Sequence, residues 1–148
     1  MKDLNTLRVA VACDHAGFEL KEELVKIFSD KLFELKDFGT YSSDSVDYPD
    51  MIHPMAKEVN DGNFDFGIAI CGSGNGISMT ANKHQGIRAA LCSDTYSAKM
   101  TRQHNDANVL CMGARILSFE KTIEITDAFL GAEFLGGRHQ RRVDMLEN

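Results

Sequence analysis

One cysteine stands where the chain passes from an apolar run to a glycine-rich turn. The run is Phe66 to Cys71, and the turn is Gly72-Ser73-Gly74-Asn75-Gly76, which leads into a predicted helix. The first amides of a helix lack partners within it and carry partial positive charge, so they bind anions and favour a thiolate over a thiol. The pattern predicts a base beside an anion pocket. That pairing suits removal of a proton next to a carbonyl and stabilisation of the resulting oxyanion.

The same glycine-rich turn leaves a nucleotide-binding or a purely structural role open. Its spacing is G-x-G-x-G, whereas a dinucleotide loop is G-x-G-x-x-G and a P-loop ends in Gly-Lys-Ser or Gly-Lys-Thr. Asp94, at the end of the next predicted strand, keeps a dinucleotide interpretation available. A thiol phosphatase would need an arginine closing the loop, but the chain continues Ile77-Ser78-Met79. Because residues 66–93 contain no Asp or Glu, a base at this loop would have to be Cys71 itself.

Two further groups of polar residues follow predicted elements and could act at the same crevice. Asp14 and His15 come directly after the first predicted strand. A carboxylate can hold sugar hydroxyls, and a histidine can hold an anion or carry a proton, while an N-cap of the next helix is the alternative role for Asp14. His104 ends a predicted helix close to the fifth strand, where a helix C-terminus also favours a histidine of no catalytic role.

A basic cluster follows Gly136-Gly137, the strongest break in the chain. In a predicted helix over residues 138–147, Arg138 and Arg142 are four residues apart and share a face. Two guanidinium groups on one face suit a dianionic phosphate, with a solvated basic face as the alternative. Because the cluster lies beyond the glycine pair, it could reach the crevice of a neighbouring subunit.

Short apolar runs predict five buried parallel strands, and the segments between them have helical spacing. The strands are predicted at Arg8 to Cys13, Phe33 to Phe38, Phe66 to Cys71, Arg88 to Ser93 and Val109 to Met112. The helices are predicted at Phe18 to Phe28, Pro49 to Val59, Gly76 to Lys83, Thr95 to His104 and Phe119 to Leu130. Alternating strands and helices indicate a Rossmann-like, doubly wound α/β fold of three layers, with helices on both faces of a five-stranded parallel sheet. Ligands should bind where the strand-to-helix loops gather, at residues 14–17, 39–48, 72–76, 94–95 and 113–115.

Length and composition limit the class of protein. The 148 residues fit a single domain, 1–148, that can bury about two thirds of its unfolded surface without metal or disulfides. A net charge of −6 argues against nucleic acid or an anionic membrane as the main partner. The sequence has no apolar signal segment and no membrane-length apolar stretch, so we expect a cytoplasmic protein. Cys13, Cys92 and Cys111 end apolar runs without C-x-x-C spacing, which is typical of reduced, buried thiols rather than zinc ligands.

Several short motifs occur together and in a fixed order. They are Cys13-Asp14-His15, Asp47-Tyr48-Pro49, Ile70 to Ile77, Ala81-Asn82-Lys83, Tyr96-Ser97-Ala98, Arg102 to Asp106 and Gly136 to Gln140. In this combination the chain resembles the B-type ribose-5-phosphate isomerases, a family that also includes the subunits of galactose-6-phosphate isomerase. The resemblance runs from about Arg8 to Val143.

The resemblance implies an aldose–ketose isomerase of the pentose phosphate pathway that needs no metal or cofactor. It would interconvert ribose 5-phosphate and ribulose 5-phosphate through an enediol or enediolate. Cys71 would be the proton-transfer base and His104 the acid–base group that opens the sugar ring, with Ser73 assisting the amides of residues 72–76 as an oxyanion pocket. The substrate-binding residues would be Asp14, His15, Tyr48, Gly72, Gly74, Asn75, Gly76, Asn105, Arg115, Arg138 and Arg142. Of these, Asp14 and Asn105 would hold sugar oxygens, Tyr48 would line the pocket, and His15 with the three arginines would hold the phosphate.

The resemblance also implies an assembly. The family is dimeric with shared active sites, so we expect a homodimer, or alternatively a tetramer, in which the C-terminal helix reaches the partner subunit. One branch of the family uses a carboxylate later in the glycine loop, but Gly76-Ile77-Ser78 offers none here, which favours the cysteine mechanism. A hexose-phosphate isomerase acting on galactose 6-phosphate or allose 6-phosphate is the nearest alternative. A nucleotide-binding regulatory module is the alternative from another class.

Overall fold

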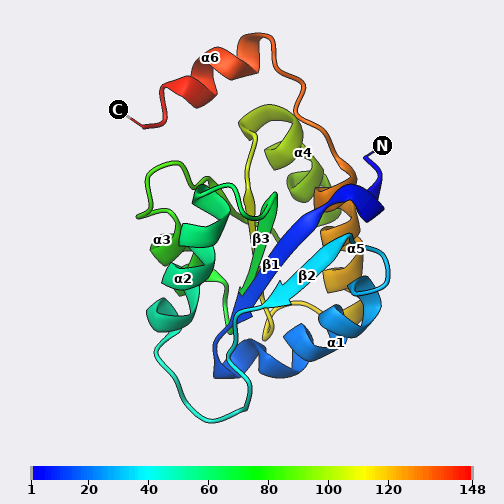
Figure 1. Ribbon diagram of the computed structural model, residues 1–148, viewed down its shortest axis with the longest axis vertical. Helices are drawn as coiled ribbons and strands as arrows, with labels where there is room; N and C mark the ends of the chain where they lie inside the picture. Colours follow the sequence, from blue (N-terminus) through cyan, green and yellow to red (C-terminus); the bar gives the residue numbers. More distant parts are fainter. Residues whose placement is uncertain (1, 148) are drawn as a thin grey trace.

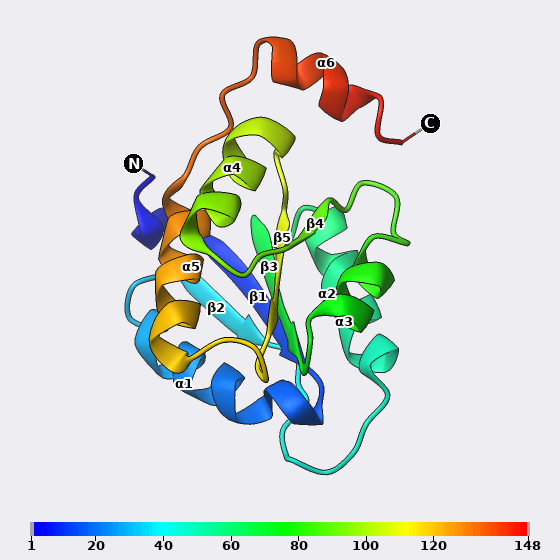
Figure 2. The same ribbon diagram turned by 180° about the vertical axis from the view of Figure 1, so that it is seen from behind.

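The computed structural model describes residues 2–147, and its centre is a parallel sheet with the strand order β2-β1-β3-β5-β4 (Figures 1 and 2). The strands are β1 (Arg8–Cys13), β2 (Glu34–Asp37), β3 (Phe66–Cys71), β4 (Ala89–Leu91) and β5 (Val109–Gly113). The register pairs Cys13 with Ile70 and Cys71 with Gly113, so the carboxyl ends of the three central strands lie side by side. The predicted five-stranded, doubly wound α/β fold is confirmed.

The central and edge strands differ in burial. Every residue of β3 and β5 is buried, and so is all of β1 after Arg8. The two outer strands β2 and β4 contain no fully buried residue, so the prediction that all five strands are buried is wrong for them. Each has a neighbour on one side only, and in β2 the exposed Glu34 and Lys36 alternate with the half-buried Leu35 and Asp37.

Helices cover both faces of the sheet. The α-helices are α1 (Phe18–Phe28), α2 (Tyr48–Asn60), α3 (Asn75–Ala81), α4 (Thr95–Asn105), α5 (Phe119–Gly131) and α6 (Arg138–Asp144), with short 3-10 helices η1 (Leu4–Thr6) and η2 (His15–Gly17). One apolar cluster joins the sheet to α1, α4 and α5, and a second joins it to α2 and α3. Between residues 2 and 147, no helix has both the length and the apolar character needed to cross a membrane.

The last helix stands apart from the body of the molecule. Gly136 and Gly137 have φ angles of 64° and 57°, a backbone region that glycine adopts without strain, and α6 follows them directly. Figures 1 and 2 show α6 beyond one end of α4, with the sheet on the other side of that helix. Only Val143 of α6 is buried. The helix ends at Asp144, shorter than the predicted 138–147, and its basic face is left exposed.

Candidate active site

Cys71 is the last residue of β3 and is buried at the floor of a pocket. Its Sγ accepts a hydrogen bond from the amide of Gly74 at 3.1 Å. The turn that makes this bond needs glycine, because Gly74 has a φ of 84° and a Cβ there would collide with Leu91. The thiol therefore contacts the loop amides while it also packs against the apolar cluster under α2 and α3.

The loop after Cys71 presents backbone donors. Among the described residues, the amides of Gly72, Ser73 and Gly76 have no protein acceptor, whereas the amide of Asn75 donates to Ser73 Oγ at 3.2 Å. The helix that follows, α3, has only seven residues, so the loop amides themselves are the main donors. A set of unpaired amides beside a thiol can hold an oxyanion.

The loop after β5 adds positive charge to this pocket. The amides of Ala114 and Arg115 donate to the carbonyls of Cys71 and Gly72 at 2.8 and 3.0 Å, which joins the two loops. The guanidinium of Arg115 then lies over Gly72, since a Cβ there would be 3.1 Å from its Nη1. The pocket thus has one arginine at its mouth for an anionic group.

Asp14 and His15 follow β1 and face the same edge of the sheet. Asp14 Oδ1 accepts from the amides of Ala16 and Gly17 at 2.9 and 3.1 Å, so the predicted alternative of an N-cap is confirmed, and the same side chain also lines the pocket. His15 Nδ1 accepts from the amide of Val46 at 3.2 Å. In the neutral ring this bond places the proton on Nε2, which becomes a hydrogen-bond donor.

Tyr48 forms a wall of the pocket from the start of α2. Its ring packs against Gly76 so closely that a Cβ on that glycine would lie 2.6 Å from Tyr48 Cζ. The glycine is needed here for contact with the ring, which explains part of the glycine-rich pattern.

A buried lysine holds the loop that connects β2 to Tyr48. The Lys21 side chain is fully buried, and its Nζ donates to both carboxylate oxygens of Asp37 at 2.9 and 2.7 Å and to the carbonyl of Thr40 at 2.6 Å. Sequence reasoning missed this residue. Its signal is the spacing of Lys21, Leu24 and Phe28 on the buried face of α1, where a lysine occupies a core position.

These side chains and loops enclose a pocket of about 460 Å³ at the carboxyl edge of the sheet. Its lining residues are Asp14, Tyr48, Cys71, Gly72, Ser73, Gly76, Arg115 and Ile116. The expectation that the loop at residues 94–95 joins this crevice is wrong, because β4 is an outer strand separated from β3 by β5. Asp94 instead caps α4 and accepts from the amide of Ser97 at 2.6 Å.

The remaining predicted site residues lie at the opposite edge of the sheet. The helix α4 runs back toward the amino edge, where His104 and Asn105 end it just before β5 begins. Cys71 pairs with the last residue of β5, whereas α4 ends just before the first. The length of that strand alone therefore separates Cys71 from the end of α4 by about 13 Å. His104 stacks on His139 of α6 with ring centroids 4.4 Å apart, so Arg138 and Arg142 belong to this second group.

Burial shifts the pKa values of three cysteines and of one histidine. Burial raises the pKa of Cys13 to about 12, although the nearby Lys21 partly opposes the change, and raises the pKa of Cys92 to about 11. The pKa of Cys111 is raised further by the same cause. Loss of hydration, together with the charges of His104, Arg138 and Arg142, lowers the pKa of His139.

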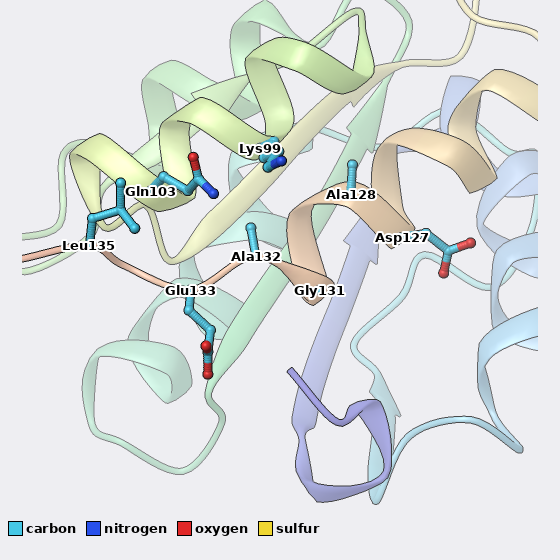
Figure 3. A pocket seen from close by; sticks show the side chains of 8 residues that line it. All are labelled: Lys99, Gln103, Asp127, Ala128, Gly131, Ala132, Glu133 and Leu135. Carbon is cyan, nitrogen blue, oxygen red and sulfur yellow. The ribbon is translucent and has the colours of Figure 1, made fainter. Parts of the chain in front are cut away.

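A second pocket lies between α4, α5 and the segment that leads to α6 (Figure 3). It measures about 430 Å³ and is lined by Lys99, Gln103, Asp127, Ala128, Gly131, Ala132, Glu133 and Leu135. The charged ends of Asp127 and Glu133 point in different directions in Figure 3, and the lining contains no thiol or histidine. This pocket lacks the combination of a thiol and unpaired loop amides that the Cys71 pocket has.

Fold and pocket together indicate an α/β enzyme with a thiol, open loop amides and an arginine at the carboxyl edge of its sheet. The Ribose/Galactose Isomerase family matches residues 9–146, and the chain belongs to this family. Ribose-5-phosphate isomerase B of Escherichia coli (strain K12) is 49% identical over 139 residues, which cover 94% of this chain and 93% of that protein.

Solved structures show the same fold. Ribose-5-phosphate isomerase B of Clostridium thermocellum has a TM-score of 0.93 at 45% identity, covering 95% of each chain. The enzyme of Mycoplasma genitalium, with bound ribulose-5-phosphate, has a TM-score of 0.89 at 42% identity, covering 93% of this chain and 91% of that one.

The four cysteines should react differently with an alkylating agent. At pH 8, iodoacetamide should label Cys71 first, because Cys71 lines an open pocket while burial keeps Cys13, Cys92 and Cys111 protonated. Mass spectrometry of tryptic peptides measures the order of labelling. The Cys71→Ser protein is the control and should take up label slowly. Fast labelling of Cys13 or Cys92 in the folded protein would show that Cys71 is not the most reactive thiol.

Proposed function

We propose that this chain is an aldose–ketose isomerase that interconverts ribose 5-phosphate and ribulose 5-phosphate. The observation that carries the proposal is the thiol of Cys71 beside the unpaired amides of Gly72, Ser73 and Gly76, in a pocket that also contains Arg115. The relative from Mycoplasma genitalium, whose structure holds ribulose-5-phosphate, supports a pentose phosphate as the substrate.

The reaction requires one carbon-bound proton to move between adjacent carbons. In the open-chain aldose, the Cys71 thiolate takes the proton from C2, and the electrons of that C–H bond form the C1–C2 double bond while the carbonyl oxygen O1 becomes an oxyanion. The loop amides hold O1, and Ser73 assists transfer of the hydroxyl proton from O2 to O1. Cys71 then returns its proton to C1 as the C2 carbonyl forms, so atoms and charge balance without a metal or cofactor.

Groups of the same pocket hold the sugar. The Oδ2 of Asp14 is not used in the N-cap and can accept a sugar hydroxyl. The ring of Tyr48, fixed against Gly76, limits the width of the pocket and keeps water from the reacting carbons. Arg115 in the pocket lining and His15, next to Asp14 on the loop after β1, supply the first contacts for the phosphate.

We further propose that a second copy of the chain completes the site. In one chain, His104, Asn105, Arg138 and Arg142 lie at the edge of the sheet opposite to Cys71. A homodimer that brings the two edges together would add the ring-opening histidine and two guanidinium groups for the phosphate dianion. The exposed basic face of α6, beyond its glycine hinge, supports this arrangement.

The alternatives have weaker support. The family description covers both ribose and galactose isomerases, so ribose, allose and galactose phosphates should be compared directly in turnover assays. A dinucleotide would need an acidic residue free to hold its ribose, whereas Asp94 is engaged in the cap of α4.

The proposal includes a cytoplasmic location and a role in the pentose phosphate pathway, because a catalytic thiol among four unpaired cysteines suits a reducing compartment.

Replacement of the thiol tests the proton-transfer role. The Cys71→Ala protein should lose at least about 1,000-fold in kcat for ribose 5-phosphate, because the base is removed while the loop amides remain. Proton NMR in D2O measures incorporation of deuterium into the sugar during turnover. Cys92→Ala removes another buried thiol outside the pocket and should keep its activity; turnover by Cys71→Ala protein close to that control would reject Cys71 as the base.

Replacement of His104 tests ring opening separately. Ribulose 5-phosphate cannot form a furanose because its C5 oxygen carries the phosphate, so its proton exchange needs no ring opening. His104→Ala should lower turnover of ribose 5-phosphate about 100-fold but lower deuterium exchange into ribulose 5-phosphate far less. His53→Ala is the control for loss of a histidine elsewhere. Equal losses on both sugars would remove the ring-opening role from His104.

A further inference from the structure

The end of α4 has a left-handed residue and an ion pair whose arginine is buried. Asp106 follows His104 and Asn105 directly and has φ 48° and ψ 42°, and it is the one residue other than glycine with a positive φ in the described part of the chain. Its amide and that of Ala107 both donate to the carbonyl of Thr101. Aspartate tolerates a left-handed backbone better than most side chains do, and a left-handed residue commonly ends a helix, so Asp106 can stop α4 at this point.

Two arginines hold the Asp106 carboxylate from different elements. Its Oδ1 accepts from Arg102 Nη1 at 2.8 Å, and its Oδ2 accepts from Arg88 Nη2 at 3.3 Å. Arg88 Nε also donates to the Asp106 backbone carbonyl at 2.8 Å. Since Arg88 directly precedes β4 and Arg102 lies on α4, the carboxylate ties the end of the helix to the sheet.

The pair with Arg102 is strongly constrained. The Arg102 side chain is 6% exposed, and its guanidinium carbon lies 4.6 Å from the centre of the Phe66 ring. Its Nη1 also donates to the carbonyl of Ala107 at 2.7 Å, while its Nε has no partner in residues 2–147. Asp106 is the one carboxylate within ion-pair distance of Arg102 in that range. A buried cation with one counter-ion holds that counter-ion in a narrow range of positions.

We propose that Asp106 is a positioning residue for His104 and Asn105. The directions in which these two side chains leave α4 are set by the backbone of its last turn, which the Arg88–Asp106–Arg102 bridge fixes. Without the bridge, the last turn loosens and the His104 ring loses its alignment with the sugar ring oxygen. This inference rests on the proposed isomerase function and adds to it residues that touch no substrate.

The test neutralises the carboxylate while keeping its size. Asn tolerates left-handed backbone, so Asp106→Asn removes the charge and leaves the turn accessible. We expect kcat for ribose 5-phosphate to fall about tenfold, whereas deuterium exchange into saturating ribulose 5-phosphate should stay within about twofold of the wild type. KM should rise for both sugars because Asn105 also moves.

Asp65→Asn is the matched control. The Asp65 side chain is 33% exposed, as is that of Asp106, and it pairs with Arg8 at 3.4 Å away from α4. Asp65→Asn should lower the free energy of unfolding, but it should change turnover of ribose 5-phosphate and deuterium exchange into ribulose 5-phosphate to the same extent. A difference between the sugars in Asp106→Asn that is absent from Asp65→Asn supports the positioning role, and equal effects of the two variants on both sugars would overturn it.

A second variant covers the case in which Asp106→Asn does not fold. Arg88→Gln removes one arm of the bridge at a residue that is partly exposed. It should also slow ribose 5-phosphate more than ribulose 5-phosphate, but by a smaller factor than Asp106→Asn does. A folded Arg88→Gln protein that slows both sugars equally, or neither, would reject the proposal. A wild-type protein that exchanges deuterium into neither sugar would reject the isomerase function itself, and the positioning role with it. If the wild type is active but each variant affects both sugars equally, only the positioning role is rejected.

Discussion

The direction of the strands is the constraint on which the site depends. All five strands are parallel, so every strand-to-helix loop lies at the carboxyl edge and every helix returns the chain to the amino edge. Cys71 ends a strand and His104 belongs to the end of a helix, so the two cannot meet within one chain without breaking this topology. Under the proposed function, a site that uses both residues would therefore take Cys71 from one chain and His104 from a second copy.

Close packing shapes the pocket around Cys71. Glycine allows the backbone of the loop to approach Tyr48 and Leu91, and the amides that would be covered by side chains stay open. Lys21 holds the start of the β2–α2 loop through Asp37 and Thr40, and the amide of Val46, further along the same loop, donates to His15. Preorganised donors of this kind stabilise an oxyanion without rearrangement during the reaction.

Local spacing was sufficient to predict much of this arrangement. The apolar runs of β1, β3 and β5 and the turn after Cys71 lie where the sequence indicated, because burial and glycine conformations act over a few residues. Exposure of β2 and β4 could not be predicted, since it depends on strand order. Lys21 and the bridge of Arg88, Asp106 and Arg102 were missed for a related reason: their partners are charged groups brought together by tertiary packing.

A mixed dimer tests most directly whether two chains share each site. Cys71→Ala and His104→Ala chains with different affinity tags can be co-expressed and the heterodimer isolated through both tags. If the sites are shared, one of its two sites has both native residues, so the heterodimer should have about half of the wild-type activity on ribose 5-phosphate. A heterodimer no more active than the two parent variants would show that each site lies within one chain.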